Sequence, residues 1–226
     1  MQFIFSLHPD VEVKNNEKCT PLHVSCKVGN NLAVEYLVSK SANIESVDKD
    51  LNTPLHLACS EGHLSVVQFL LSAKANLEAE NFEKFTPLHF SCKNGHQKIV
   101  EFLIAHRSNI KAETKLQYTP LHFAVESGHL DITELLVSKK ANIETVQHKD
   151  CTPLLIAIIQ GNIKITELLL SKKANIEAKQ RNQLPLYLAT KHGHIDIIEL
   201  LLCKKANIDA ASEYTPLHIS IINGYI

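Results

Sequence analysis

An eleven-residue pattern recurs along the chain at a nearly constant interval, and it constrains the fold more than any other feature. Its four clearest copies read TPLHVSCKVGN, TPLHLACSEGH, TPLHFSCKNGH and TPLHFAVESGH. Successive copies start 33, 33, 33, 33, 32 and 31 residues apart, at Thr20, Thr53, Thr86, Thr119, Thr152, Leu184 and Thr215. A glycine follows nine residues after every start, so the register holds even where the first residues diverge.

One copy of the pattern predicts two short helices and an extended linker. The Thr53 hydroxyl can cap a helix, and Pro54 suits its first position because its φ is preset and its missing N–H would be unpaired there. Gly62 ends this helix, since glycine readily adopts the left-handed conformation. The segment HLSVVQFLLS, residues 63–72, then carries one broad apolar face of a second helix.

Helices this short cannot bury their apolar faces alone, so the units must stack into a solenoid. The period, the TPLHxA motif, the GH pair and the segment ELLLSKKANIEA resemble ankyrin repeats over nearly the whole chain. The resemblance implies an all-α fold, an ankyrin-repeat α-solenoid of stacked helix-turn-helix units. It also implies L-shaped units, in which the linker forms a hairpin finger at right angles to the helix pair.

The repeat boundaries predict a single ankyrin-repeat domain over residues 1–226. A partial repeat occupies 1–19, and a second partial repeat occupies 215–226. Six full repeats lie between them, at 20–52, 53–85, 86–118, 119–151, 152–183 and 184–214.

The fingers depart from the family pattern at two positions that are commonly glycine. The first, before the AN pair, holds Ser41, Lys74, Arg107, Lys140, Lys173 and Lys205, and the second, two residues before the motif, holds Lys18, Leu51, Lys84, Gln117, Asp150, Asn182 and Glu213. A positive φ would cost an ordinary residue on the order of 1 kcal/mol. We therefore expect fingers that are looser or differently turned.

Charge and composition exclude several classes of partner. Lys and Arg total 23 against 24 for Asp and Glu, so the net charge of -1 favours neither nucleic acid nor an anionic membrane. The first ten residues, MQFIFSLHPD, lack the basic lead of a secretory signal, and no apolar run approaches the roughly 18 residues of a membrane helix. The sequence predicts a cytoplasmic protein, with the nucleus as the alternative location.

Cysteine spacing predicts a reduced core. Cys26, Cys59 and Cys92 occupy one repeated position, and equivalent atoms of stacked layers lie about 10 Å apart, beyond the ~7 Å Cα separation of a disulfide. We expect these three to be buried and reduced, and Cys19, Cys151 and Cys203 to be partly exposed.

Thirteen histidines invite a catalytic or metal interpretation, but nine recur at two fixed repeat positions. We expect the histidine of each motif to bond the preceding threonine and a backbone group of the next unit. His192 and His194 have no further ligands in view for a zinc site. Glutamates that recur in every layer are interpreted as solvated surface rows. Motifs of nucleotide-binding, hydrolase and metalloprotease sites are absent, so no enzyme activity, catalytic residue, metal, cofactor or small-molecule substrate is predicted.

The resemblance implies a protein partner, bound on the concave face by finger tips and by the end of helix one. Large apolar residues gather on two adjacent fingers and would form its centre: Phe82, Phe85, Leu116 and Tyr118. Exposed positions at the ends of two first helices would form a polar rim: Lys93, Asn94, Glu126 and Ser127. Phe90 and Phe123 are assigned to the core. In the alternative interpretation, the aromatic finger residues pack between fingers instead of binding a partner.

A second functional hypothesis remains open at this stage. The chain could be the recognition segment of a larger enzyme or channel, whose active part lies outside these 226 residues. The reading frame beyond Ile226 would distinguish the two hypotheses.

Overall fold

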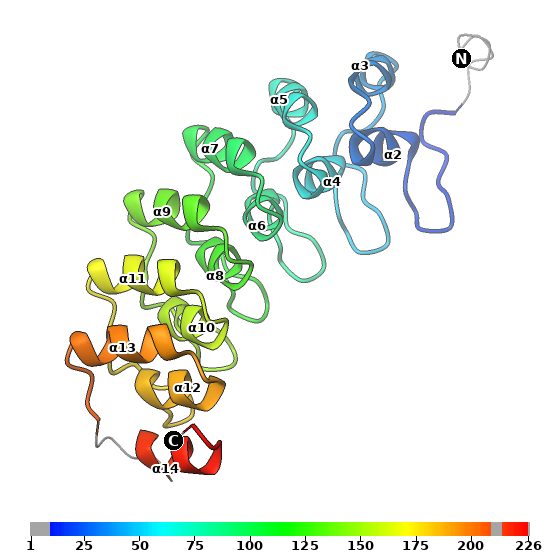
Figure 1. Cartoon of the computed structure of the whole chain (residues 1–226). Coiled ribbons are helices and arrows are strands. Elements are labelled where there is room, and N and C mark those ends of the chain that lie inside the picture. The colour runs from blue at the N-terminus through cyan, green and yellow to red at the C-terminus, as the bar shows by residue number, and fades with distance from the viewer. Residues whose placement is uncertain (1–9, 209–213, 226) are drawn as a thin grey trace. The chain divides into compact units, whose positions relative to one another are not determined.

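The computed structural model in Figure 1 describes residues 10–208 and 214–225. Helices are the regular elements of this part of the chain, apart from one isolated β-bridge between Gln180 and Gln183. The chain divides into two compact units, Met1–Asn109 and Ile110–Ile226, and each is described by itself.

The first helix of every repeat begins at the proline of the motif. These helices are α2 (Pro21–Lys27), α4 (Pro54–Glu61), α6 (Pro87–Lys93), α8 (Pro120–Glu126), α10 (Pro153–Ile159), α12 (Pro185–His192) and α14 (Pro216–Ile222). The Thr residue caps each of them except α12, where Leu184 provides no side-chain bond. Capping therefore sets these helix starts, as the sequence predicts.

The second helix of each repeat is nine residues long. These helices are α3 (Asn31–Ser39), α5 (Leu64–Ser72), α7 (Gln97–Ala105), α9 (Leu130–Ser138), α11 (Ile163–Ser171) and α13 (Ile195–Cys203). Within the first unit, α2, α4 and α6 pack in one row and α3, α5 and α7 in another; within the second, α8, α10, α12 and α14 form one row and α9, α11 and α13 the other.

The core of each unit is the apolar surface between these rows. The leucine of the motif is fully buried at Leu22, Leu55, Leu88 and Leu121, and the following helix contributes residues such as Leu70 and Leu136. The predicted all-α stacked solenoid is confirmed. That residues 1–226 form one domain stays a prediction.

The predicted state of the cysteines is largely correct. Cys26, Cys59 and Cys92 are buried free thiols, and burial raises their pKa values, to about 12 for Cys26 and Cys59. Cys19 is half-buried and Cys203 is exposed. Cys151 is buried, contrary to expectation, with 3% of its surface exposed.

The expectation of differently turned fingers is wrong. Every described residue at the two glycine positions has a positive φ, from 56° at Lys18 to 69° at Lys74. Glu213 lies outside the described residues. The left-handed turn therefore persists throughout without glycine, and other interactions must offset its cost.

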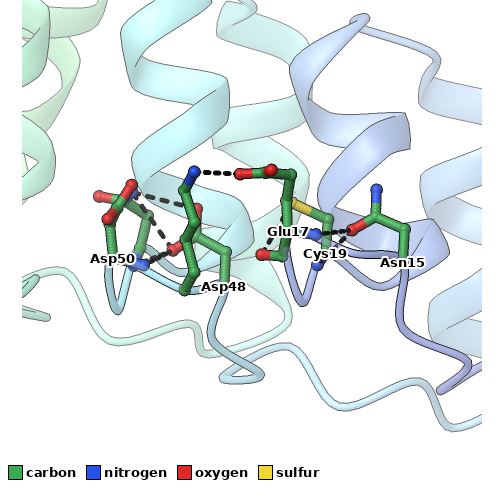
Figure 2. A network of polar contacts seen from close by, with 7 residues as sticks. Asn15, Glu17, Cys19, Asp48 and Asp50 are labelled. Atoms are coloured by element: carbon green, nitrogen blue, oxygen red, sulfur yellow. Dashed lines mark hydrogen bonds and ion pairs between the residues drawn. The ribbon is translucent and has the colours of Figure 1, made fainter.

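Side-chain oxygens in the fingers supply some of those interactions. Asn15 Oδ1 accepts hydrogen bonds from the N–H groups of Glu17 and Cys19, both at 2.9 Å. Asp48 does the same in the next finger, for the N–H groups of residues 50 and 52, at 2.9 and 2.8 Å. Figure 2 shows these two turns side by side, joined by an ion pair between the side chains of Lys49 and Glu17. Each turn is thus bonded internally and to its neighbour.

The glutamate of the NIE segment is another such interaction, rather than part of a solvated row. Its carboxylate accepts a hydrogen bond from the N–H of the asparagine in the following repeat, at 2.7 to 2.9 Å, in five pairs: Glu12 with Asn43, Glu45 with Asn76, Glu78 with Asn109, Glu144 with Asn175 and Glu177 with Asn207. The interpretation of this glutamate as a merely solvated residue is wrong.

Lys111 interrupts this series, since an ammonium group has no acceptor for the N–H of Asn142. We expect Lys111→Glu to extend this series of hydrogen bonds to the N–H of Asn142 and to stabilise the protein by about 1 kcal/mol. The melting temperature should rise by roughly 2 to 4 °C, measured by circular dichroism. Lys179→Glu makes the same charge change at another exposed finger residue. An equal rise in both variants would show that net charge, not the bond, is responsible.

Candidate functional site

Three of the motif histidines, His23, His56 and His122, are bonded through both ring nitrogens. Nδ1 of His56 accepts a hydrogen bond from the N–H of Thr53 at 3.0 Å, so its Nε2 carries the proton and donates to the carbonyl oxygen of Phe85, also at 3.0 Å. His23 bonds Thr20 and the carbonyl of Asn52 in the same way. These carbonyls lie one residue before the next motif, at the end of the finger rather than inside the next repeat.

Burial of these imidazoles disfavours their charged form. Desolvation lowers the pKa of His56 and of His122 from 6.5 to about 4, and it also lowers the pKa of His23. Each ring is therefore neutral at physiological pH. A neutral, fully buried imidazole with both nitrogens bonded serves the structure and cannot act as a base or a metal ligand.

The histidines that follow the glycine form a second set of hydrogen bonds between repeats, which the sequence alone did not predict. His63 Nε2 faces the carbonyl oxygen of Lys27 in the preceding repeat at 3.0 Å, and His96 faces that of Ser60 at 2.8 Å. The ring packs against the glycine of the preceding repeat, because a Cβ on Gly29 would stand 2.4 Å from His63 Nδ1. The pair of Gly and His recurs once per repeat in the sequence, and this recurrence could have predicted the contact between repeats.

His192 and His194 stack with ring centroids 5.9 Å apart, but His194 Nε2 faces the carbonyl oxygen of Ile159. Over residues 10–208 and 214–225, no group of three or more His, Cys, Asp or Glu side chains is placed to hold a metal ion.

In the first unit, the two phenylalanines of one finger have different environments. The N–H of Phe82 donates to the carbonyl oxygen of Asp50 at 2.9 Å, while 57% of the residue's surface is exposed. Phe85 is half-buried, with its ring centroid 5.2 Å from that of Phe90 and Lys93 Nζ 5.8 Å from its own centroid. Phe85 and Phe90 hold the positions of a hydrophobic staple, just before the cap and four residues after it.

The second unit repeats this division. Leu116 is 50% exposed, and its carbonyl oxygen accepts a hydrogen bond from the N–H of His148 at 3.1 Å. Tyr118 is only 6% exposed and stacks on Phe123, with ring centroids 5.0 Å apart. Phe123 is buried as predicted, whereas Phe90 is half-buried. Tyr118, like Phe85, fastens the finger to its own helix.

The four predicted rim residues are all exposed: Lys93 and Asn94 in the first unit, and Glu126 and Ser127 in the second. Asn94 Nδ2 donates to the carbonyl oxygen of Ser60 at 2.8 Å, which fixes its amide. The eight predicted residues thus form one group of four in each unit. Their role in binding stays a prediction.

None of the helices in the described ranges is long and apolar enough to cross a membrane. No curated protein matches the sequence. Among solved structures, the crystal structure of the human ASB11 ankyrin repeat domain is similar, with a TM-score of 0.80 and 27% sequence identity over 89% of this chain and 91% of that one.

The family model for ankyrin repeats, three copies, matches residues 1–81, 73–147 and 140–212. Ankyrin repeats are generally protein–protein interaction modules, and their fold is typically non-catalytic. With the motif, the helix pairs and the fingers in place and the family model matching most of the sequence, this chain belongs to the ankyrin-repeat family.

Proposed function

We propose that this chain is a non-enzymatic interaction module that binds a partner protein through its finger tips and the ends of its first helices. One observation carries the proposal. Phe82 and Leu116 expose large apolar side chains, while backbone hydrogen bonds to neighbouring fingers hold the residues that carry them. Side chains on a fixed backbone lose little conformational freedom on binding, so they suit the role of anchors.

The surroundings of these anchors support a protein partner. Exposed apolar residues rimmed by polar groups mark interaction sites, and a few large side chains carry most of the binding energy of an interface. Lys93 and Asn94 provide the polar rim in the first unit, and Glu126 and Ser127 provide it in the second. Phe85 and Tyr118 lie beneath their fingers and contribute mainly by fixing the finger shape.

The proposal is tested with a partner identified by proximity labelling and then purified. We expect Phe82→Ala and Leu116→Ala to weaken its affinity at least tenfold each, about 1.4 kcal/mol, with the melting temperature unchanged. Phe85→Ala and Tyr118→Ala should instead lower the melting temperature, because each removes a staple contact. Gln183→Ala, on another finger, is the control and should change neither quantity.

Affinity by isothermal titration and stability by circular dichroism are measured on the same preparations. Unchanged affinity in both Phe82→Ala and Leu116→Ala would exclude the finger tips as the binding surface. Loss of stability in those two variants would show that they pack within the fold instead.

A further inference from the structure

A ridge of lysines runs along one edge of the second unit. Here α9, α11 and α13 lie side by side, and Figure 1 shows their carboxyl ends at the same edge. Each helix is followed directly by two lysines, and all six are exposed: Lys139 with Lys140, Lys172 with Lys173, and Lys204 with Lys205. We call these six residues the lysine ridge. It shares no residue with the finger surface proposed above and does not depend on that proposal.

The helix ends account for only one lysine of each pair. Lys139, Lys172 and Lys204 are the carboxyl-terminal caps, where a cation complements the negative end of the helix dipole. The first unit shows that one such residue suffices. There the equivalent pairs each hold a single lysine or arginine: Lys40 with Ser41, Ala73 with Lys74, and His106 with Arg107. The second lysine of each ridge pair therefore needs another explanation.

The second lysine of each pair occupies a position that normally favours glycine. Lys140 donates its N–H to the carbonyl oxygen of Val137, and the next N–H along the chain donates to that of Leu136, both at 3.0 Å. These two bonds define a Schellman motif, whose left-handed residue is usually glycine. The φ of this residue is 65° at Lys140, 66° at Lys173 and 63° at Lys205. A side chain strains the backbone in this conformation, and strained residues cluster at functional sites.

The six ammonium groups have no carboxylate partner within residues 10–208 and 214–225, where none of them forms an ion pair. The glutamates of the same helices are Glu134, Glu167 and Glu199. They lie five or six residues before the lysines, whereas side chains meet on a helix at a spacing of three or four. Glu144 and Glu177 follow the first two pairs, but each accepts a hydrogen bond from a backbone N–H of the next repeat. The ridge is therefore a locally positive row on a chain whose net charge is -1.

The surroundings of the ridge argue against a membrane and against nucleic acid. Glu134, Glu167 and Glu199 are exposed on the same three helices, so a flat anionic membrane would meet a row of carboxylates beside the lysines. Proteins that bind single-stranded nucleic acid combine a basic groove with aromatic side chains. The helices and lysine pairs of the ridge, residues 130–141, 163–174 and 195–206, contain no aromatic residue. An acidic protein segment needs only a narrow positive row.

The spacing of the ridge sets the spacing of charges in its ligand. Packed helices lie about 10 Å apart, so successive lysine pairs repeat at about that distance. An extended chain advances about 3.3 Å per residue, so roughly three residues span one repeat. A carboxylate at every third residue would thus meet one lysine pair after another.

We propose that the lysine ridge binds an extended acidic segment of a partner protein, with an aspartate or glutamate at every third residue. Each carboxylate lies between the two ammonium groups of one pair. Lysine carries a flexible point charge, so the spacing of the charges, rather than a fixed hydrogen-bond geometry, determines the fit. Because all of these groups are exposed, the binding is weak and depends on the salt concentration.

The probe is the peptide DSGDSGDSGD, labelled for fluorescence anisotropy and added to the full chain at low salt. We expect saturable binding below about 1 mM, and raising the salt to about 0.3 M should weaken it roughly tenfold. The peptide DDDDSGSGSG has the same composition and charge but lacks the spacing. It should bind about threefold more weakly or worse, because only part of it can face the lysine pairs.

On the protein, Lys140→Gln, Lys173→Gln and Lys205→Gln in combination remove one charge from each pair and should weaken peptide binding roughly tenfold. The melting temperature should not change, because Gln117 already adopts a φ of 62° in a finger. Arginine at the same three positions keeps the charge and should retain binding. The matched control removes three charges from exposed lysines of the same unit outside the ridge and should also retain binding: Lys149→Gln, Lys179→Gln and Lys191→Gln.

Several results would overturn the proposal. One is the absence of binding at about 1 mM peptide, or equal affinity for the two peptides. Another is an affinity that the ridge variant leaves unchanged, or that the control variant lowers as much, which would assign the binding to net charge. A third is tighter binding, at the same salt, to vesicles of phosphatidylcholine and phosphatidylserine or to oligothymidylate, which would make the ridge a membrane or nucleic-acid site.

Discussion

Lowering the pH from 7 to 5 is expected to reduce the free energy of unfolding by about 2 kcal/mol for each of two histidines, His56 and His122. Both have a pKa of about 4 in the folded chain against 6.5 ordinarily, because burial disfavours the imidazolium. The unfolded chain therefore binds protons below pH 6.5 while the folded chain does not. Stability is fully present above pH 6.5 and is lost as the pH falls toward 4.

Urea unfolding at pH 7, 6 and 5 measures this effect. The double variant His56→Leu with His122→Leu is the matched control, since Leu155 occupies the equivalent place in another repeat and is fully buried there. The variant loses the hydrogen bonds of both rings and starts less stable, but its loss between pH 7 and 5 should be less than half that of the parent. An identical loss in both proteins would show that the acid sensitivity arises from other groups.

The sequence predicts most of the fold because its signals are local and repeated. Thr, Pro and Gly set the ends of the first helix in every repeat but one, where Leu184 replaces the Thr, and a period of 31 to 33 residues fixes their register. The fingers were predicted less well. The absence of glycine argued for a different turn, but the oxygens of Asn15 and Asp48 hold that turn with bonds that a propensity rule does not include.

The residues of the candidate site were also predicted only in part. Phe82 and Phe85 look alike in the sequence because both are aromatic residues of one finger. Their environments differ because Phe85 lies five residues before Phe90, in the spacing of a hydrophobic staple. The same spacing joins Tyr118 to Phe123. That pairing was visible in the sequence, whereas the exposure of Phe82 depends on how the finger is bonded to its neighbour.

Glycine is expected to stabilise the chain where ordinary residues now hold a positive φ at the ends of the second helices. A side chain in the left-handed conformation costs the folded chain roughly 1 to 2 kcal/mol, which glycine avoids. Glycine also gives the unfolded chain more conformational freedom, and this reduces the gain in stability by about 0.5 to 1 kcal/mol. Ser41, Lys74, Lys140 and Lys173 are exposed and have φ between 65° and 69°. Replacing all four with glycine should therefore add about 2 to 4 kcal/mol, because sites this far apart act independently.

The neighbouring residues provide a control that separates backbone strain from charge and side-chain loss. Lys40, Lys139 and Lys172 each precede one of the substituted positions and have φ between -83° and -91°. Glycine at these three positions should lower the melting temperature, because no strain is relieved and the unfolded chain gains freedom. Equal destabilisation of both sets, measured by thermal unfolding, would mean that the left-handed positions carry no strain. The expected opposite signs would show that the fingers keep their turn against a backbone cost, which the bonds between repeats offset.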